Sequence, residues 1–97
     1  MDDFEKQVIM LFKALSDSTR QEIFQLLCDC VEGEMNVSAI CAKFNTTQPT
    51  ISHHLQILKG CDVVDSRKDG KNIYYYIKKE VVKDVFGNII ERFHIKF

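Results

Sequence analysis

The side chains with the clearest capacity for chemistry stand in one polar run followed by one basic run. Within the polar run, residues 47–59, the amide, hydroxyl and imidazole candidates are Gln48, Thr50, Ser52 and His53. A glutamine amide can pair with adenine through two hydrogen bonds, and a hydroxyl can serve a base edge or a phosphate. The basic run that follows supplies cations that can hold phosphates, namely Arg67, Lys68 and Lys71. The two runs together predict contact with double-stranded DNA.

A helix must carry the polar run. Thr47 can accept the first free backbone N–H groups, and Pro49 falls in the first turn, where its missing N–H does no harm. Ile51, Leu55 and Leu58 recur at helical spacing, so the polar side chains are left largely on the other faces. In helix-turn-helix proteins, the N-terminal part of such a helix reads the bases. We therefore expect the four polar candidates to be the base readers.

The basic run belongs to a predicted β-hairpin. Residues 63–68 and 73–77 show the alternation of strands, and Asp69-Gly70-Lys71-Asn72 forms the turn between them. The three cations lie at or near the tip of this hairpin. We call the helix that carries the polar run the reading helix. We expect the hairpin to reach along the DNA backbone beside this helix.

Helical periodicity accounts for most of the remaining chain. Apolar residues recur at helical spacing in the segments 4–15, 23–30 and 82–93, and Asn36 is placed to cap a short helix that continues to Phe44. The order predicts a mainly α fold with a small β-hairpin. The expected architecture is a winged helix-turn-helix of five helices plus a two-stranded antiparallel wing, forming a single domain over residues 1–97.

The terminal helices, expected over residues 2–16 and 79–95, carry apolar stripes that a lone helix would not leave in water. A chain of 97 residues has room for only a modest core, and pairing with a second copy would add buried surface. We therefore expect a homodimer with these two helices at its interface.

Charge is unevenly distributed along the chain. The net charge is −1, yet residues 43–71 carry five bases against three acids, while residues 1–34 carry eight acids against three bases. The first twenty residues show neither a signal peptide nor a membrane span, so we expect a cytoplasmic protein that does not engage a membrane. The four cysteines should remain thiols there, which argues against a disulfide scaffold.

Some of these polar residues also have a purely structural interpretation. Thr47, Gln48 and Thr50 could serve only to cap the helix. Of the two adjacent histidines, His54 lies on the side turned towards the preceding helix, which favours an internal hydrogen bond. His53 is the histidine that we expect at the DNA.

Three ordered motifs of the chain resemble the signature regions of ArsR/SmtB repressors. They read ALSDSTRQEIFQLL, TTQPTISHHLQILK and SRKDGKNIYYYI, and they lie at the spacings of that family. Near the end of the reading helix the family usually has glycine where this chain has Asp62, a residue that tolerates a left-handed cap. The resemblance implies a homodimeric repressor that binds a palindromic operator and is released by an inducer, commonly a metal ion.

The chain departs from the metal sites that the resemblance implies. Asn36 and Ser38 stand where the family's thiolate pair would be, and in residues 79–95 Arg92 and apolar residues stand where histidine and glutamate ligands would be expected. We therefore predict no confident cofactor and leave the inducer unidentified. A thiophilic metal ion or thiol-based redox sensing is the minor alternative, with Cys28, Cys30 and Cys61 as weak candidates. Cys28 and Cys30 could chelate one ion only if the helix ends at Cys28, and core packing is the commoner role for Cys30 and Cys41.

Two other classes of function compete with a sequence-specific repressor. A winged-helix dimer without DNA binding would serve as a protein-interaction module, which the weak basic charge favours. An enzyme is not expected, because the chain has no phosphate-cradling glycine loop or productive metal-ligand spacing.

Overall fold

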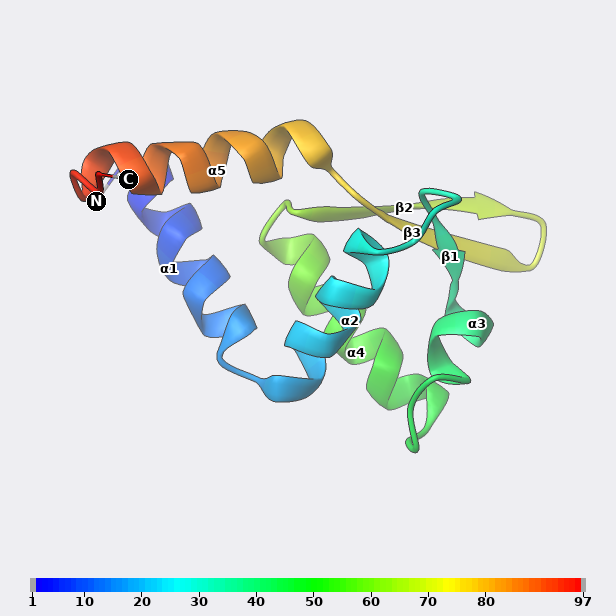
Figure 1. Ribbon diagram of the computed structural model, residues 1–97. Helices are drawn as coiled ribbons and strands as arrows, with labels where there is room; N and C mark the ends of the chain where they lie inside the picture. Colours follow the sequence, from blue (N-terminus) through cyan, green and yellow to red (C-terminus); the bar gives the residue numbers. More distant parts are fainter. Residues whose placement is uncertain (1, 97) are drawn as a thin grey trace.

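The computed structural model describes residues 2–96 and is mainly helical with one small sheet (Figure 1). The helices and strands, in chain order, are α1 (Asp3–Leu15), α2 (Ser18–Cys28), β1 (Met35–Asn36), α3 (Val37–Cys41), α4 (Gln48–Gly60), β2 (Val64–Asp69), β3 (Asn72–Ile77) and α5 (Lys79–Arg92). This order confirms the predicted five helices and the hairpin after the polar helix.

Helix α4 forms where the sequence predicts it. Its N-cap is Thr47, whose side chain accepts from the Thr50 N–H, and Pro49 lies in the first turn. Ile51, Leu55 and Leu58 are fully buried, so the helix is held by its apolar face. The chain leaves the helix through Asp62, which has a φ of 67°. Asp62 therefore adopts the left-handed conformation that the departure from the family glycine predicts.

The wing has three strands in place of the predicted two. Strands β2 and β3 pair from Val64↔Ile77 to Asp69↔Asn72, which leaves a two-residue turn. Strand β1 adds to the other edge of β3, with Met35 opposite Tyr75. A two-residue strand is too short to show a period of 2, so this pairing had no local signal in the sequence.

Two other helix boundaries differ from the predictions. Helix α3 is capped by Asn36 as expected but ends at Cys41, short of Phe44. Helix α5 ends at Arg92 rather than at residue 95, and His94 has a φ of 55°, which interrupts the helical path. Left-handed backbone at a helix end is a local event that apolar periodicity does not report.

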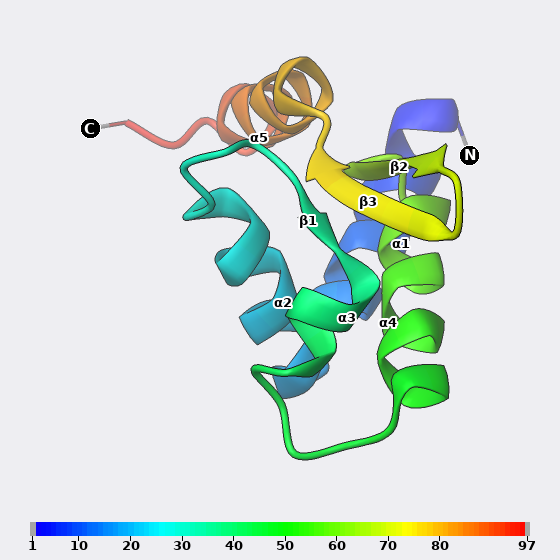
Figure 2. The same ribbon diagram turned by 90° about the vertical axis from the view of Figure 1, so that its right-hand side faces the viewer.

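One core joins all five helices. Its fully or nearly fully buried residues include Leu11 of α1, Ile23 of α2, Ile40 of α3, Leu55 of α4 and Val85 of α5. Helices α2 and α4 pack against each other below the sheet, and α3 packs against α4 and β1 (Figure 2). The core therefore packs against the buried face of the reading helix α4, and contacts with the sheet hold this helix beside the wing.

The start of α1 and the end of α5 meet on the side of the molecule opposite the hairpin turn (Figure 1). The Arg92 guanidinium lies 4.6 Å from the centre of the Phe4 ring and 3.5 Å from a Glu5 carboxylate oxygen. These contacts tie the last helix to the first within one chain. Within residues 2–96, no helix combines the length and the apolar character needed to cross a membrane.

Candidate nucleic-acid interface

The predicted base readers divide between two faces of α4. Gln48 and Ser52 line a groove of about 190 Å³ between α4, the start of α3 and the wing, and Lys71 of the wing also lines it. Thr50 and His53 do not line this groove but are exposed. The structure thus brings two of the predicted readers and one predicted phosphate contact together in one concavity.

The capping interpretation holds for two of the threonines. The Thr47 hydroxyl accepts from the Thr50 N–H, and the two hydroxyls lie 2.9 Å apart within hydrogen-bonding distance. Thr50 therefore has a local partner for its hydroxyl, although its side chain remains exposed. The N-terminal turn of α4 is built to hold its shape before any contact with DNA.

The two histidines differ as the sequence predicts. Nη1 of Arg20 lies 3.2 Å from Nδ1 of His54, and Nε of Arg20 donates to the carbonyl of Ala14. Because a guanidinium has no acceptor, this contact requires Nδ1 of His54 to accept, which places the proton of a neutral ring on Nε2. His54 thus has the internal partner expected of it, whereas His53 is exposed and free to face a ligand.

Arg67, a predicted phosphate contact, is paired within the protein. Its Nε donates to both carboxylate oxygens of Glu34 at 3.1 and 3.0 Å, and its Nη2 lies 2.8 Å from Oε2. The guanidinium also lies over the Tyr74 ring at 4.5 Å, with Asp69 at 4.0 Å. The hydrogen bonds to Glu34 raise the pKa of Arg67 above its ordinary value. Lys68 and Lys71 are exposed on the same hairpin.

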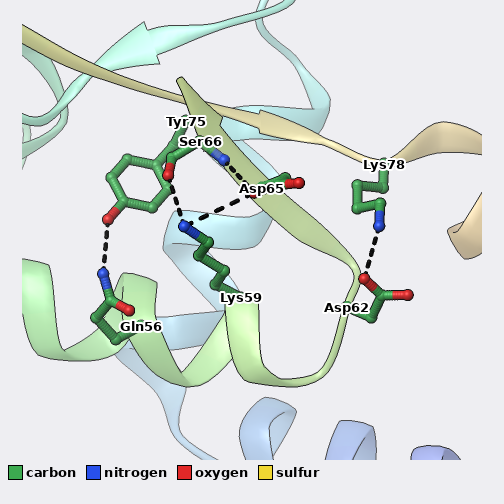
Figure 3. A network of polar contacts seen from close by, with 7 residues as sticks. All are labelled: Gln56, Lys59, Asp62, Asp65, Ser66, Tyr75 and Lys78. Atoms are coloured by element: carbon green, nitrogen blue, oxygen red, sulfur yellow. Dashed lines mark hydrogen bonds and ion pairs between the residues drawn. The ribbon is translucent and has the colours of Figure 1, made fainter. Parts of the chain in front are cut away.

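A polar network joins α4 to the wing (Figure 3). The Gln56 amide donates to the Tyr75 hydroxyl at 3.0 Å, and Lys59 Nζ donates to the Ser66 hydroxyl at 2.9 Å and lies 3.7 Å from an Asp65 carboxylate oxygen. The sequence places Gln56 and Lys59 on an outward face without naming their partners. Tyr75 is buried. The alternation of inward and outward side chains along its strand was the one sequence signal that could have predicted its contact with Gln56.

A further ion pair of this network lies at the end of α4. Lys78 Nζ donates to the Asp62 carboxylate at 2.6 Å, and this hydrogen bond raises the pKa of Lys78. Lys78 is the residue that leads from β3 into α5, so the ion pair fixes the exit of the reading helix next to the start of the last helix.

The cysteines do not gather into a site. Helix α2 ends at Cys28, the condition for chelation by Cys28 and Cys30, but the Cys30 thiol instead donates to the Glu34 carbonyl at 3.2 Å. Across residues 2–96, no group of three or more histidine, cysteine or acidic side chains is placed to hold a metal ion. Asn36, at the position of the family thiolates, accepts from the Ala39 N–H as the cap of α3.

Thiol chemistry also finds little support at the other candidates. The residue Cys28 is exposed, but neighbouring atoms partly desolvate its thiol. This desolvation, with a smaller contribution from Asp29, raises the pKa of the thiol and so lowers the fraction of reactive thiolate. Cys61 is buried, its pKa is raised by burial, and its Sγ lies 3.3 Å from the carbonyls of Met10 and Ile57. The core cysteine is thus Cys61, whereas Cys30 and Cys41, expected in the core, are only partly buried.

Similarity to known proteins agrees with this geometry. The chain is 42% identical over 91 residues to an uncharacterized HTH-type transcriptional regulator from Methanocaldococcus jannaschii, covering 94% of this chain and 99% of that protein. It is 42% identical over 74 residues to the transcriptional repressor SdpR from Bacillus subtilis, covering 76% and 79% of the two chains. The homodimeric winged helix-turn-helix DNA-binding domain from Mycobacterium bovis, solved by NMR, superposes with a TM-score of 0.72 at 28% identity, covering 99% and 92%.

The family model described as "Bacterial regulatory protein, arsR family" matches residues 17–66, which run from the cap of α2 to the first half of β2. The matched segment includes the whole of α4 and the turn before it, where the predicted base readers lie. The protein is therefore a member of the arsR family of winged helix-turn-helix DNA-binding transcriptional regulators.

Proposed function

We propose that the protein is a homodimeric repressor that binds a palindromic operator and is released by an inducer still to be identified. The observation that carries this proposal is the groove in which Gln48 and Ser52 of α4 face Lys71 of the wing. Base-reading and phosphate-binding groups thus converge on one surface, as a helix in the major groove with a hairpin on the flanking backbone requires.

Each predicted contact has a distinct role in the proposed complex. The exposed readers of α4 meet base edges, and the lysines of the hairpin tip hold phosphates. The base readers are Gln48, Thr50, Ser52 and His53, and the phosphate contacts are Lys68, Lys71 and, after release from Glu34, Arg67. Changes to the first set should alter preference among sequences, and changes to the second should weaken binding to all of them.

The dimer interface in this proposal is formed by α1 and α5, continued by the segment after α5. Large apolar side chains remain exposed there although the core is complete, for example Phe12 at 53% and Phe93 at 60% exposure. The others on these helices and the following segment are Ile9, Met10, Phe86 and Ile95. A second copy of the chain is the occupant we propose, in keeping with the homodimeric relative. Two-fold symmetry in the protein then matches a palindromic site.

We further propose that the protein acts in the cytoplasm and responds to a chemical inducer. A regulator of this kind works where the DNA is, in the cytoplasm, and the proposal assigns no catalytic role to any residue. A metal ion remains a candidate inducer on the family resemblance, but the described cysteines and acids offer it no ready site. The trigger is therefore to be sought by adding metals, oxidants and persulfides to the protein–operator complex.

The test is selection of preferred duplexes from a randomised library, followed by titration of the selected and a scrambled duplex at two salt concentrations. We expect nanomolar-range binding of the selected duplex that weakens steeply with salt. Gln48→Ala should reduce the preference for the selected duplex, whereas Lys71→Ala should weaken both duplexes alike. Gln25→Ala, which removes an exposed amide on α2, outside the groove and the proposed dimer interface, is the matched control for Gln48→Ala and should change neither.

Equal affinity for selected and scrambled duplexes would overturn the proposal in favour of a protein-interaction module. If Gln48→Ala and Lys71→Ala behave alike, the division into base and phosphate contacts is wrong even though the protein binds DNA.

A further inference from the structure

Glu34 and Arg67 are brought together by the third strand of the wing. Glu34 directly precedes β1, and β1 is held by the pairing of Asn36 with Tyr74. Tyr74 is in turn the register partner of Arg67 on β2. The three strands therefore place the guanidinium across the Tyr74 ring and against the Glu34 carboxylate, on the face of the sheet opposite the buried Tyr75.

The pair uses the donors that a phosphate would need. A guanidinium recognises carboxylate and phosphate through the same two-pronged geometry, so Nε and Nη2 cannot serve Glu34 and a phosphate together. With Glu34 and Asp69 beside it, the Arg67 charge is neutralised and adds little to the attraction of DNA. An approaching phosphate would also repel the Glu34 carboxylate.

We propose that Glu34 competes with the DNA backbone for Arg67, so that operator binding exchanges the Glu34–Arg67 pair for an Arg67–phosphate contact. This inference rests on the proposed function and adds Glu34 as a positioning residue that acts through Arg67. It sets the affinity for DNA by a factor that is the same for every sequence, because the phosphate contact carries no base information.

The exchange also couples the loop between α2 and β1 to the DNA. The Cys30 thiol donates to the Glu34 carbonyl at 3.2 Å and lies 3.6 Å from Oε2 of Glu32. The Gly33 N–H donates to the Cys30 carbonyl at 3.1 Å, with Gly33 at a φ of 86°, which closes a tight turn. Release of the Glu34 side chain removes one of the contacts that hold this turn against the wing, so DNA binding should loosen the surroundings of Cys30. Linkage requires that a change at the loop alter DNA affinity in return.

The first experiment is a titration of the selected and scrambled duplexes with Glu34→Gln, Arg67→Ala and the double variant. Glu34→Gln should tighten binding of both duplexes by about two- to five-fold, the range expected from losing an exposed ion pair. Arg67→Ala should cost more affinity in the Glu34→Gln background than in the wild type, and it should lower the slope of log affinity against log salt by about one.

Glu22→Gln is the matched control, since it removes an equal charge from an exposed position on α2 and touches neither Arg67 nor the loop. If Glu34→Gln binds no more tightly than Glu22→Gln, or if Arg67→Ala leaves the salt slope unchanged, the exchange does not occur. Circular dichroism of each variant verifies the fold. If Glu34→Gln fails to fold, Glu34→Ala takes its place.

The second readout uses the wild-type chain. Alkylation of Cys30 by iodoacetamide, followed peptide by peptide with mass spectrometry, should be faster when the selected duplex is bound, while Cys61 alkylation should not change. An unchanged rate at Cys30 would contradict the coupling. If the wild type selects no duplex, the proposed function fails together with this inference. If it selects one and Glu34→Gln is silent, only this inference fails.

Discussion

The wing side and the terminal-helix side of the molecule treat their side chains in opposite ways. On α4 and the wing, the apolar residues Leu55 and Leu58 are fully buried and most outward groups are polar or charged, although Ile73 of β3 is 38% exposed. On α1 and α5, the inner residues Leu11 and Val85 are buried as well, yet a second set of large apolar groups such as Phe12 remains exposed. The terminal-helix side therefore leaves more large apolar side chains exposed than the wing side does.

The difference shows what each side is suited to bind. A surface of amides, hydroxyls and cations can exchange its hydrogen bonds with water for those of a polar polymer. Exposed aromatic and aliphatic groups gain free energy only when another apolar surface covers them. This difference supports the proposal that DNA binds on the wing side and that a second copy of the chain covers the terminal helices.

The largest expected effect is on the wing side, beneath α4. Leu55→Ala removes a fully buried side chain beneath the reading helix and should lower the free energy of unfolding by about 2–5 kcal/mol, since the cavity cannot fully collapse. Urea unfolding followed by circular dichroism measures it. A loss below about 1 kcal/mol would mean that the α4 side is looser than its burial indicates.

The next effect should separate dimerisation from folding. Phe12→Asp places a charge in the proposed interface of both copies and should weaken the dimer by about 100-fold or more, with the helical content retained. Analytical ultracentrifugation measures the dissociation constant. Val31→Asp is the matched control, because Val31 is 96% exposed but lies on the loop after α2, away from the proposed interface. A dimer unaffected by Phe12→Asp would remove the proposed role of α1.

A smaller effect should sharpen the description of the wing side. Tyr75→Phe removes only the hydroxyl that accepts from Gln56 and should cost about 0.5–1.5 kcal/mol of stability. Hydrogen exchange should show the loss concentrated in β2 and β3. Tyr76→Phe is the matched change on the same strand. Equal costs for the two variants would show that the Gln56 contact does not hold the wing to α4.

The smallest effect concerns α2, which packs against both α1 and α4. Its N-cap Asp17 accepts from the Arg20 N–H, and this hydrogen bond lowers the pKa of Asp17. Because the pKa is lower in the folded than in the unfolded chain, the stabilisation is present above about pH 4 and is lost as the pH falls through the folded value. Asp17→Asn keeps a good cap and should therefore show a flatter decline of Tm below about pH 4 than the wild type. Parallel declines would exclude this role of the carboxylate.

Much of the fold and of the candidate interface follows from local patterns in the chain. Thr47, Pro49 and the spacing of Ile51 and Leu55 predict α4 and its exposed polar face, because capping and amphipathicity depend on neighbours within a few residues. An internal hydrogen bond of His54 was also predicted from its face of the helix, although its partner Arg20 lies on α2 and not on the preceding helix α3. The exact residues that contact DNA stay predictions until the duplex titrations are made.

The sequence by itself thus determined the order of helices, the polar reading helix, the basic hairpin and the family membership, since each depends on residue types at short separations. Only the tertiary structure decided that β1 joins the wing, that Cys61 is the core thiol, and that Arg67 is held by Glu34. The last contact spans 33 positions along the chain. No periodicity or cap reports such a pair, because it exists only once β1, β3 and β2 lie side by side.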